Sequence, residues 1–278
     1  MRGWKCVQLR SERIQLGVAL WTYFVPKGCK EDWIYCAIVV THSYTIQPTV
    51  SAAGKLLTPL FIVLKEPNGD FGPRIRESLF QAPNVLVTAS KSGKLTSDHF
   101  KRYLTEVFFP NVGEKSVLLL DSWGGQCEKT VFNVVHQDKK LVHLIIPKGS
   151  TGQIQPLDVY GFRCWKNFVR RFSDLVLLND YDVNFHLRNN IIKLQSLVHN
   201  QFSSSRFSNL LKYAWYKSGY LEDRPHEFEN PAEFCFILCC PSCEFCEISF
   251  MVYYVRGVKK LCFKHFFIEF HYCNNFVL

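Results

Sequence analysis

Two aspartates stand where a carboxylate could reach a metal ion. Asp121 directly follows the continuous apolar run at residues 116–120, which predicts a buried central strand, and it precedes a glycine-containing loop. In open α/β sheets ligands gather beyond the carboxyl ends of such strands, so a carboxylate there can reach a metal in the crevice. Asp158 opens a predicted amphipathic helix in the sequence Gln155-Pro156-Leu157-Asp158. Simpler roles stay open, because aspartate is also common in turns and in the first turn of a helix.

A second set of residues suited to metal chemistry lies near the C-terminus. Cys243-x-x-Cys246 and Cys262-x-x-His265 form two ligand pairs separated by fifteen residues. This interval is typical of a zinc ribbon or treble-clef site, in which thiolates and imidazole hold zinc tetrahedrally. The alternative is a cysteine-rich terminus whose thiols pack as small hydrophobic side chains. A further group could form a second site: Cys239, Cys240, His271 and Cys273.

Basic side chains follow Asp158 along the same predicted helix. Arg163, Lys166 and Arg170 are spaced i, i+3 and i+7, which places them on one face, and Arg171 lies beside them. Together with a net charge of +9, this pattern favours contact with DNA phosphates. A solvated helix face without a ligand is the alternative.

The elements that must position these residues span residues 41–220. A β-hairpin is predicted over residues 41–50 and 59–64. A helix capped by Ser97 is predicted over residues 97–109, and a second buried strand over residues 141–146. Further helices are predicted over 127–137, 157–172, 184–201 and 206–218. The helix at 157–172 has Phe162, Trp165, Val169 and Phe172 on one face. This alternation of strands and helices predicts an α/β domain with a mixed sheet and flanking helices.

Composition and the flanking segments narrow the class of protein. With 47% hydrophobic and 21% charged residues, the chain is not intrinsically disordered. Seven of its 12 cysteines fall between Cys235 and Cys273, a clustering that favours metal binding in the cytosol or nucleus over a secreted disulfide framework. The apolar stretch at 14–25 has no cleavage site, and Pro241 interrupts the one at 234–255, so neither a signal peptide nor a membrane span is predicted.

Three motifs carry a resemblance to a known family: Leu118-Leu119-Leu120-Asp121-Ser122-Trp123, the segment Ile145-Ile146-Pro147-Lys148-Gly149-Ser150-Thr151, and Gln155-Pro156-Leu157-Asp158-Val159. They resemble the DDE superfamily endonucleases of pogo, Tigger and jerky-type transposons. The hairpin turn Ser51-Ala52-Ala53-Gly54-Lys55 with Pro59-Leu60 is similar to another segment of that family. The resemblance covers about residues 41–220.

The resemblance implies an RNase H-like fold and a metal-dependent DNA endonuclease or transposase. Asp121 and Asp158 then correspond to the second and third members of an acidic triad that holds two Mg²⁺ or Mn²⁺ ions. It divides the chain into a poorly matched segment 1–40, the endonuclease domain 41–220, an acidic linker 221–234 and a Cys/His-rich, zinc-binding-like tail 235–278. DNA is the expected partner, mainly through its phosphates, and the nucleus the expected location.

Three features depart from the family pattern. Residues 1–31 contain no aspartate, only Glu12 and Glu31 are acidic there, and Asp32 lies too close to the hairpin to be the first member of the triad. Gln126 stands near the place where the family often has histidine, and no helix-turn-helix modules precede the nuclease. We therefore expect a truncated, degenerate copy with weak or absent cleavage, because a missing carboxylate removes a bridging metal ligand.

Alternatives remain open at this level. One is a non-enzymatic interaction module, stabilised by zinc, on a domesticated transposase scaffold. Another is a translated pseudogene with no stable fold. The sequence leaves open the DNA target, the number of zinc sites and whether the chain forms a homo-oligomer.

Overall fold

The computed structural model describes residues 21–22, 44–126, 134, 139–236, 242–249, 251–255 and 257–269. The strands in these ranges are β1 (Trp21–Thr22), β2 (Thr45–Gln47), β3 (Leu60–Lys65), β4 (Val85–Ser90), β5 (Lys115–Leu120), β6 (Lys140–Ile145), β7 (Val252–Tyr254) and β8 (Lys259–Leu261). The α-helices are α1 (Pro73–Ser78), α2 (Ser97–Tyr103), α3 (Phe109–Asn111), α5 (Thr151–Ile154), α6 (Phe162–Leu178), α7 (Arg188–Phe202), α8 (Ser208–Lys217) and α9 (Pro231–Phe234). Short 3₁₀ or π-helical turns are η2 (Leu104–Phe108), η3 (Gly124–Gln126), η4 (Leu157–Gly161), η5 (Ser205–Phe207) and η6 (Lys264–Glu269). The helix predicted over 127–137 and the second Cys/His group lie outside the described residues.

A four-stranded mixed sheet is built around β3. The order is β1-β2-β3-β4, with β2 antiparallel to β3 and β4 parallel to it. The β2–β3 pairing is the hairpin that the sequence predicts. Its turn packs against the start of α8 so closely that a Cβ on Gly54 would lie 2.2 Å from the Ser208 carbonyl oxygen. Gly54 also has φ near +75°, a conformation that other residues adopt at a cost, so glycine is required there.

Strands β5 and β6 form a separate parallel pair. Strand β5 is buried from Leu118 to Leu120, as its apolar run predicts. Strand β6 was expected to be buried and is not: Val142 is 55% exposed and Ile145 50%. Among the described strands β6 pairs with β5 alone, so it forms an edge, and an apolar run by itself does not distinguish an edge strand from a central one.

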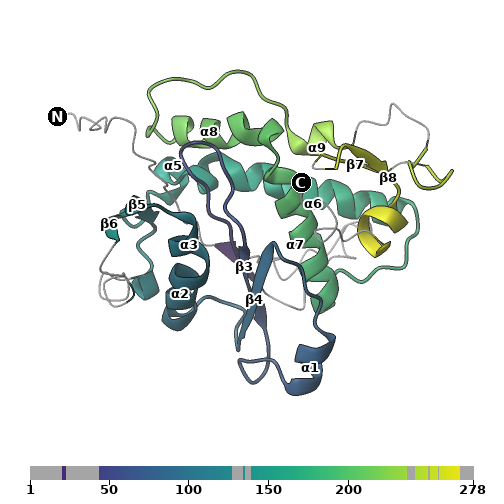
Figure 1. The fold of residues 1–278 in the computed structure, drawn as a ribbon, viewed down its shortest axis with the longest axis horizontal. Coiled ribbons are helices and arrows are strands. Elements are labelled where there is room, and N and C mark those ends of the chain that lie inside the picture. Colours follow the sequence, from purple (N-terminus) through teal and green to yellow (C-terminus); the bar gives the residue numbers. More distant parts are fainter. Residues whose placement is uncertain are drawn as a thin grey trace, which may run out of the picture.

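Helices cover both faces of these strands. On β3 the side chains alternate: Leu60, Ile62 and Leu64 belong to one apolar cluster, whereas Phe61 and Val63 belong to another. The first cluster is completed by α6, α7 and α8, and the second by α2 and η2. Strand β5 alternates in the same way: Leu119 belongs to the first cluster, and Leu118 and Leu120 belong to the second. The result is a three-layer α/β/α arrangement (Figure 1), in agreement with the predicted α/β class.

Two helices show how far local patterns predicted the fold. In α6 the four predicted apolar residues Phe162, Trp165, Val169 and Phe172 are all buried, because their spacing gives one continuous stripe. Helix α2 is capped by Thr96 rather than by Ser97. The Thr96 side-chain oxygen accepts from the His99 backbone N–H, while the Thr96 N–H donates to Nδ1 of the same histidine.

The C-terminal segment packs onto the rest of the chain. The antiparallel hairpin β7–β8 and the turn η6 lie beside α6 and α7 (Figure 1). Their buried side chains, Val252, Leu261 and Phe266 among them, belong to the same apolar cluster as α6 and α7. None of the helices that the structure describes combines the length and hydrophobicity needed to span a bilayer.

Candidate metal centres

Asp121 lies immediately after β5, in the loop that leads to η3. Its Oδ1 accepts a hydrogen bond from the Trp123 backbone N–H at 3.2 Å, which orients the carboxylate. The Trp123 side chain packs against the second apolar cluster, and a Cβ on Gly125 would lie 2.0 Å from its ring. The Gly125 position is therefore restricted to glycine, and the tryptophan ring holds the loop that carries Asp121. The sequence pattern identified Asp121 but gave no sign of this role for Trp123.

Asp158 lies in the first turn of the continuous helix formed by η4 and α6. The preceding residues Gln155, Pro156 and Leu157 are buried and fix the start of this helix. Asp158 itself reaches solvent on one side. Even so, the protein around its carboxylate removes enough water to raise its pKa to about 6.

The two carboxylates interact electrostatically. After burial, the negative charge of Asp121 is the next cause of the raised pKa of Asp158, and the cationic Lys166 opposes that rise. Burial also raises the pKa of Asp121, against the hydrogen bond from Trp123. Burial therefore disfavours the ionised form of both carboxylates, and at Asp158 the charge of Asp121 adds to this effect, which a bound cation would relieve. The candidates for a third carboxylate, Glu12, Glu31 and Asp32, lie outside the described residues.

The four predicted zinc ligands meet at one point. The ligand atoms of Cys243, Cys246, Cys262 and His265 all lie within 4.8 Å of one another. His265 Nδ1 is 3.3 Å from Cys243 Sγ, 3.5 Å from Cys246 Sγ and 3.2 Å from Cys262 Sγ, and the Cys246 and Cys262 sulfurs are 3.7 Å apart. In a tetrahedral site, zinc–sulfur bonds of about 2.3 Å and a zinc–nitrogen bond of about 2.0 Å place the ligand atoms about 3.5–3.8 Å from one another. The donor set and its spacing fit a structural zinc ion.

The surroundings of the cluster also suit zinc. His265 Nε2 lies 3.3 Å from a carboxylate oxygen of Glu269, one turn later, so the ring can present Nδ1 to a metal while Nε2–H donates to the carboxylate. Burial raises the pKa of Cys243, but hydrogen bonds from backbone N–H groups, that of Phe245 first, outweigh this and lower it to about 7. The predicted ligand set did not include Glu269, although its i, i+4 spacing from His265 is a usable signal.

The cluster is attached to α6 through aromatic side chains. Phe263 and Phe266 flank the ligand His265 in sequence, and their rings lie 6.2 and 5.5 Å from that of Phe172. Phe263 also stacks on Tyr181 at 4.2 Å. Phe172, in the middle of α6, is fully buried. The same helix therefore runs from the acidic pair at its start to the Cys/His cluster near its end.

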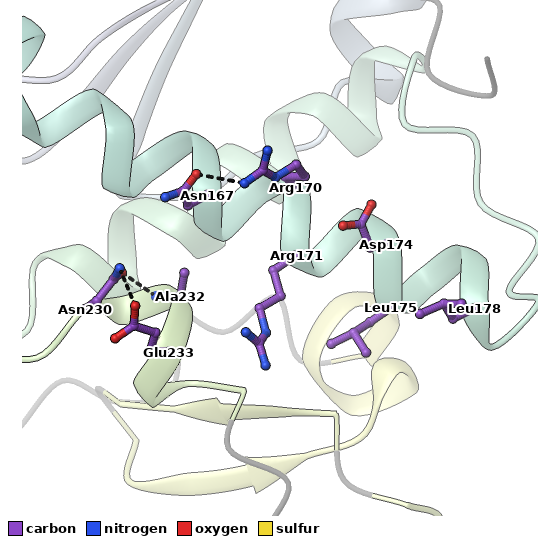
Figure 2. A pocket seen from close by; sticks show the side chains of 9 residues that line it. All are labelled: Asn167, Arg170, Arg171, Asp174, Leu175, Leu178, Asn230, Ala232 and Glu233. Carbon is purple, nitrogen blue, oxygen red and sulfur yellow. Dashed lines mark hydrogen bonds between the residues drawn. The ribbon is translucent and has the colours of Figure 1, made fainter. Parts of the chain in front are cut away.

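The four predicted phosphate-binding residues are all exposed on α6, but their contacts differ. Lys166 lies near Asp158. Arg170 donates to Asn167 Oδ1 at 3.2 Å, whereas Arg171 extends toward α9 and lies over the Phe236 ring at 5.7 Å (Figure 2). Both arginines line a pocket of about 460 Å³ between α6 and α9. Helical spacing alone did not separate Arg171 from the others.

Comparison with known proteins adds independent support. The family model of the DDE superfamily endonuclease matches residues 49–218, and that of the Tc5 transposase C-terminal domain matches residues 215–273. The first match contains both aspartates and covers more than half of the chain, and the second contains the Cys/His cluster. No curated protein and no solved structure gives a significant match. The predicted resemblance is confirmed: the chain belongs to the DDE superfamily endonucleases.

Proposed function

We propose that this chain is a nuclear, transposase-derived DNA-binding protein. In this proposal an RNase H-like domain spans residues 41–220, and a linker at 221–234 joins it to a zinc-binding tail over 235–278. Asp121 and Asp158 hold Mg²⁺ or Mn²⁺ as the second and third carboxylates of the nuclease site. The observation that carries the proposal is the electrostatic interaction of these two aspartates, which the fold brings together from the end of β5 and the start of η4. The match to the endonuclease family supports it.

The metals, when bound, supply Lewis acidity toward a DNA phosphodiester. The protein's own residues position that phosphodiester. Trp123 orients the Asp121 carboxylate through its backbone N–H, and the Gln155-Pro156 turn sets the direction of Asp158. Lys166, close to Asp158, is placed to contact a phosphate of the bound strand. Oxygen-only ligands suit the hard cations Mg²⁺ and Mn²⁺.

Cleavage by this site is weak or absent in our proposal. A two-metal site needs carboxylates that bridge the ions, and residues 1–31 offer no aspartate as the first of them. Loss of one bridging ligand lowers metal affinity and removes several kcal/mol of transition-state stabilisation. Binding to DNA does not depend on that ligand, because phosphate contacts by lysine and arginine supply most of the affinity.

A plasmid-nicking assay with Mg²⁺ or Mn²⁺, run beside a low-salt DNA-binding assay, tests the proposal. We expect DNA binding together with little nicking, and any nicking should disappear in Asp121→Ala and Asp158→Ala. The control is Asp98→Ala, which removes an exposed carboxylate on α2 that is paired with Lys101 in the same turn. Absence of DNA binding at low salt would contradict the proposal. Rapid nicking abolished by Asp121→Ala would show that the site is complete.

The Cys/His cluster favours a second candidate, a non-enzymatic interaction module stabilised by zinc. Its four ligand atoms lie within 4.8 Å of one another and need no residue from the nuclease site. This candidate predicts one zinc ion per chain by metal analysis and no dependence of the protein's interactions on Asp121 or Asp158. A purified protein without zinc would exclude it.

A further inference from the structure

A cluster of aromatic side chains joins η4, α8 and the segment before α9. The ring of Tyr160 lies 4.9 Å from that of Tyr213 and 6.0 Å from that of Phe228, and Tyr213 lies 5.0 Å from Phe228. Tyr216 extends the cluster along α8, with its ring centroid 6.1 Å from that of Tyr213. Three parts of the chain that are distant in sequence therefore supply one continuous aromatic patch.

This patch differs from the aromatic core. Phe168 and Trp215, on the same helices, are fully buried, whereas Tyr160, Tyr213, Tyr216 and Phe228 are only half-buried. Half-buried rings keep part of their surface open to solvent, and contact with a planar ligand requires such exposed surface. These four residues form the aromatic patch.

Three cationic side chains lie beside the aromatic patch. Lys217 Nζ lies 5.6 Å from the centre of the Tyr160 ring, and Arg224 Cζ lies 5.8 Å from that of Tyr213. The charge of Arg163 also acts on Tyr160, where it opposes the rise in pKa that burial causes. Two glutamates flank Phe228 in sequence: Glu229 is paired with Arg206, and Glu227 is exposed. Flat rings bordered by positive charge are complementary to bases joined by phosphates.

The aromatic patch and the acidic pair share one helical turn. Tyr160 follows Asp158 by two positions in η4, so the two side chains leave the helix on opposite sides. A strand that passes round this turn follows about half the circumference of a helix about 10 Å across, roughly 16 Å, which corresponds to about five nucleotide steps at 3.4 Å each. A DNA strand that runs round the turn from the acidic pair can therefore place nucleotides about five steps away on the aromatic patch.

We propose that the aromatic patch binds unpaired bases of the DNA strand whose backbone passes the acidic pair. The inference rests on the proposed function, since it assumes that DNA lies at Asp121 and Asp158. Stacking on aromatic rings tolerates any base and is available only where bases are unpaired. The chain is thereby assigned a preference for DNA ends, gaps or flaps over continuous duplex.

Fluorescence anisotropy with two DNA ligands tests this inference: a blunt duplex, and the same duplex carrying a short single-stranded extension. We expect the wild-type protein to bind the extended duplex about tenfold more tightly. Tyr213→Leu should abolish that preference and leave the affinity for blunt duplex unchanged, while Tyr213→Phe, which keeps the ring, should retain it. Tyr216→Leu, at the outer edge of the patch, serves if Tyr213→Leu does not fold.

Matched variants separate failure of this inference from failure of the proposed function. Arg170→Ala, on the outer face of α6, should weaken binding of both DNA ligands by the same factor. If the wild-type protein binds both ligands equally, or if Tyr213→Leu and Tyr216→Leu keep the preference, the aromatic patch is not a base-binding site and the proposed function stands. If the wild-type protein binds neither ligand, both proposals are overturned.

Discussion

The two candidate metal sites are built in different ways. All four ligands of the Cys/His cluster come from one short stretch of chain, Cys243 to His265. The acidic pair has one carboxylate at the end of β5 and the other in η4. The cluster has a complete donor set for one ion, and its supporting carboxylate, Glu269, lies one turn away. The acidic pair depends on the packing of two layers, and its expected third ligand belongs to residues outside those described. From this difference we expect the local site to tolerate changes elsewhere in the chain, and the assembled site to depend on every contributing element.

Helix α6 connects the two centres. Lys166, near its start, acts on Asp158, and Phe172, one to two turns later, packs against the aromatic side chains next to His265. The two centres thus differ in construction but share one rigid element. Substitutions at each centre and on α6 test whether the two centres behave as separate units or as one.

Removal of zinc should have the largest effect. Structural zinc sites contribute about 10–16 kcal/mol of apparent binding free energy, and the apolar residues next to the cluster belong to the main core. We therefore expect a chelator, or Cys262→Ser, to destabilise the nuclease region as well as the tail, by about 5 kcal/mol or more. Urea unfolding followed by tryptophan fluorescence measures this, because Trp165 and Trp215 are buried in that region and the tail has no tryptophan.

The control for zinc removal is Cys164→Ala, which removes a buried thiol of α6 outside the cluster. It should leave the zinc content at one ion per chain. Unfolding of the tryptophan-containing region at an unchanged urea concentration after chelation would show that the tail is an independent unit.

Two neighbouring arginines should separate DNA contact from attachment of the tail. Arg170→Ala should weaken DNA binding about threefold to tenfold at any sequence and reduce the salt slope by about 0.9, the value for one phosphate contact. Arg171→Ala should change DNA affinity less and lower stability, because its guanidinium lies over Phe236. Titrations at several salt concentrations, with thermal unfolding of each variant, measure both. Equal losses of affinity would place both arginines in the DNA interface.

Replacement of Asp158 by asparagine should have the smallest effect. The pKa of Asp158 is raised from an ordinary value near 4 to about 6, so the folded state disfavours its ionised form. Without metal, wild-type stability should fall as pH rises through this interval, and Asp158→Asn should be the more stable protein above it. Because Asp158 is partly exposed, we expect a gain below about 1 kcal/mol.

Thermal unfolding between about pH 4 and pH 7 measures this difference. The gap between wild type and Asp158→Asn should close near pH 4, where both side chains are neutral in the folded state. Mg²⁺ should stabilise the wild-type protein and have no such effect on the variant. A variant less stable than wild type at neutral pH without metal would contradict the inferred repulsion between Asp121 and Asp158.

Much of the fold follows from local patterns. The hairpin β2–β3, the strand β5 and the buried stripe of α6 were predicted because side-chain periodicity and burial on those elements are determined by nearby residues. Strand β4 was missed, since its pairing with β3 is parallel and long-range, and the exposure of β6 was not foreseen because edge position is a property of the sheet.

The sequence by itself determined the family and the zinc-type ligand set, because both are encoded in short motifs whose spacing carries the chemistry. Tertiary structure alone decided what surrounds those motifs. It placed the charge of Asp121 close enough to raise the pKa of Asp158, attached the Cys/His cluster to α6 through Phe172, and assembled the aromatic patch from three distant segments. The physical reason is the separation of the interacting residues along the chain. Ligand spacing within a turn or hairpin is determined by local backbone geometry. Electrostatic interaction and ring packing depend on which distant elements the core brings together.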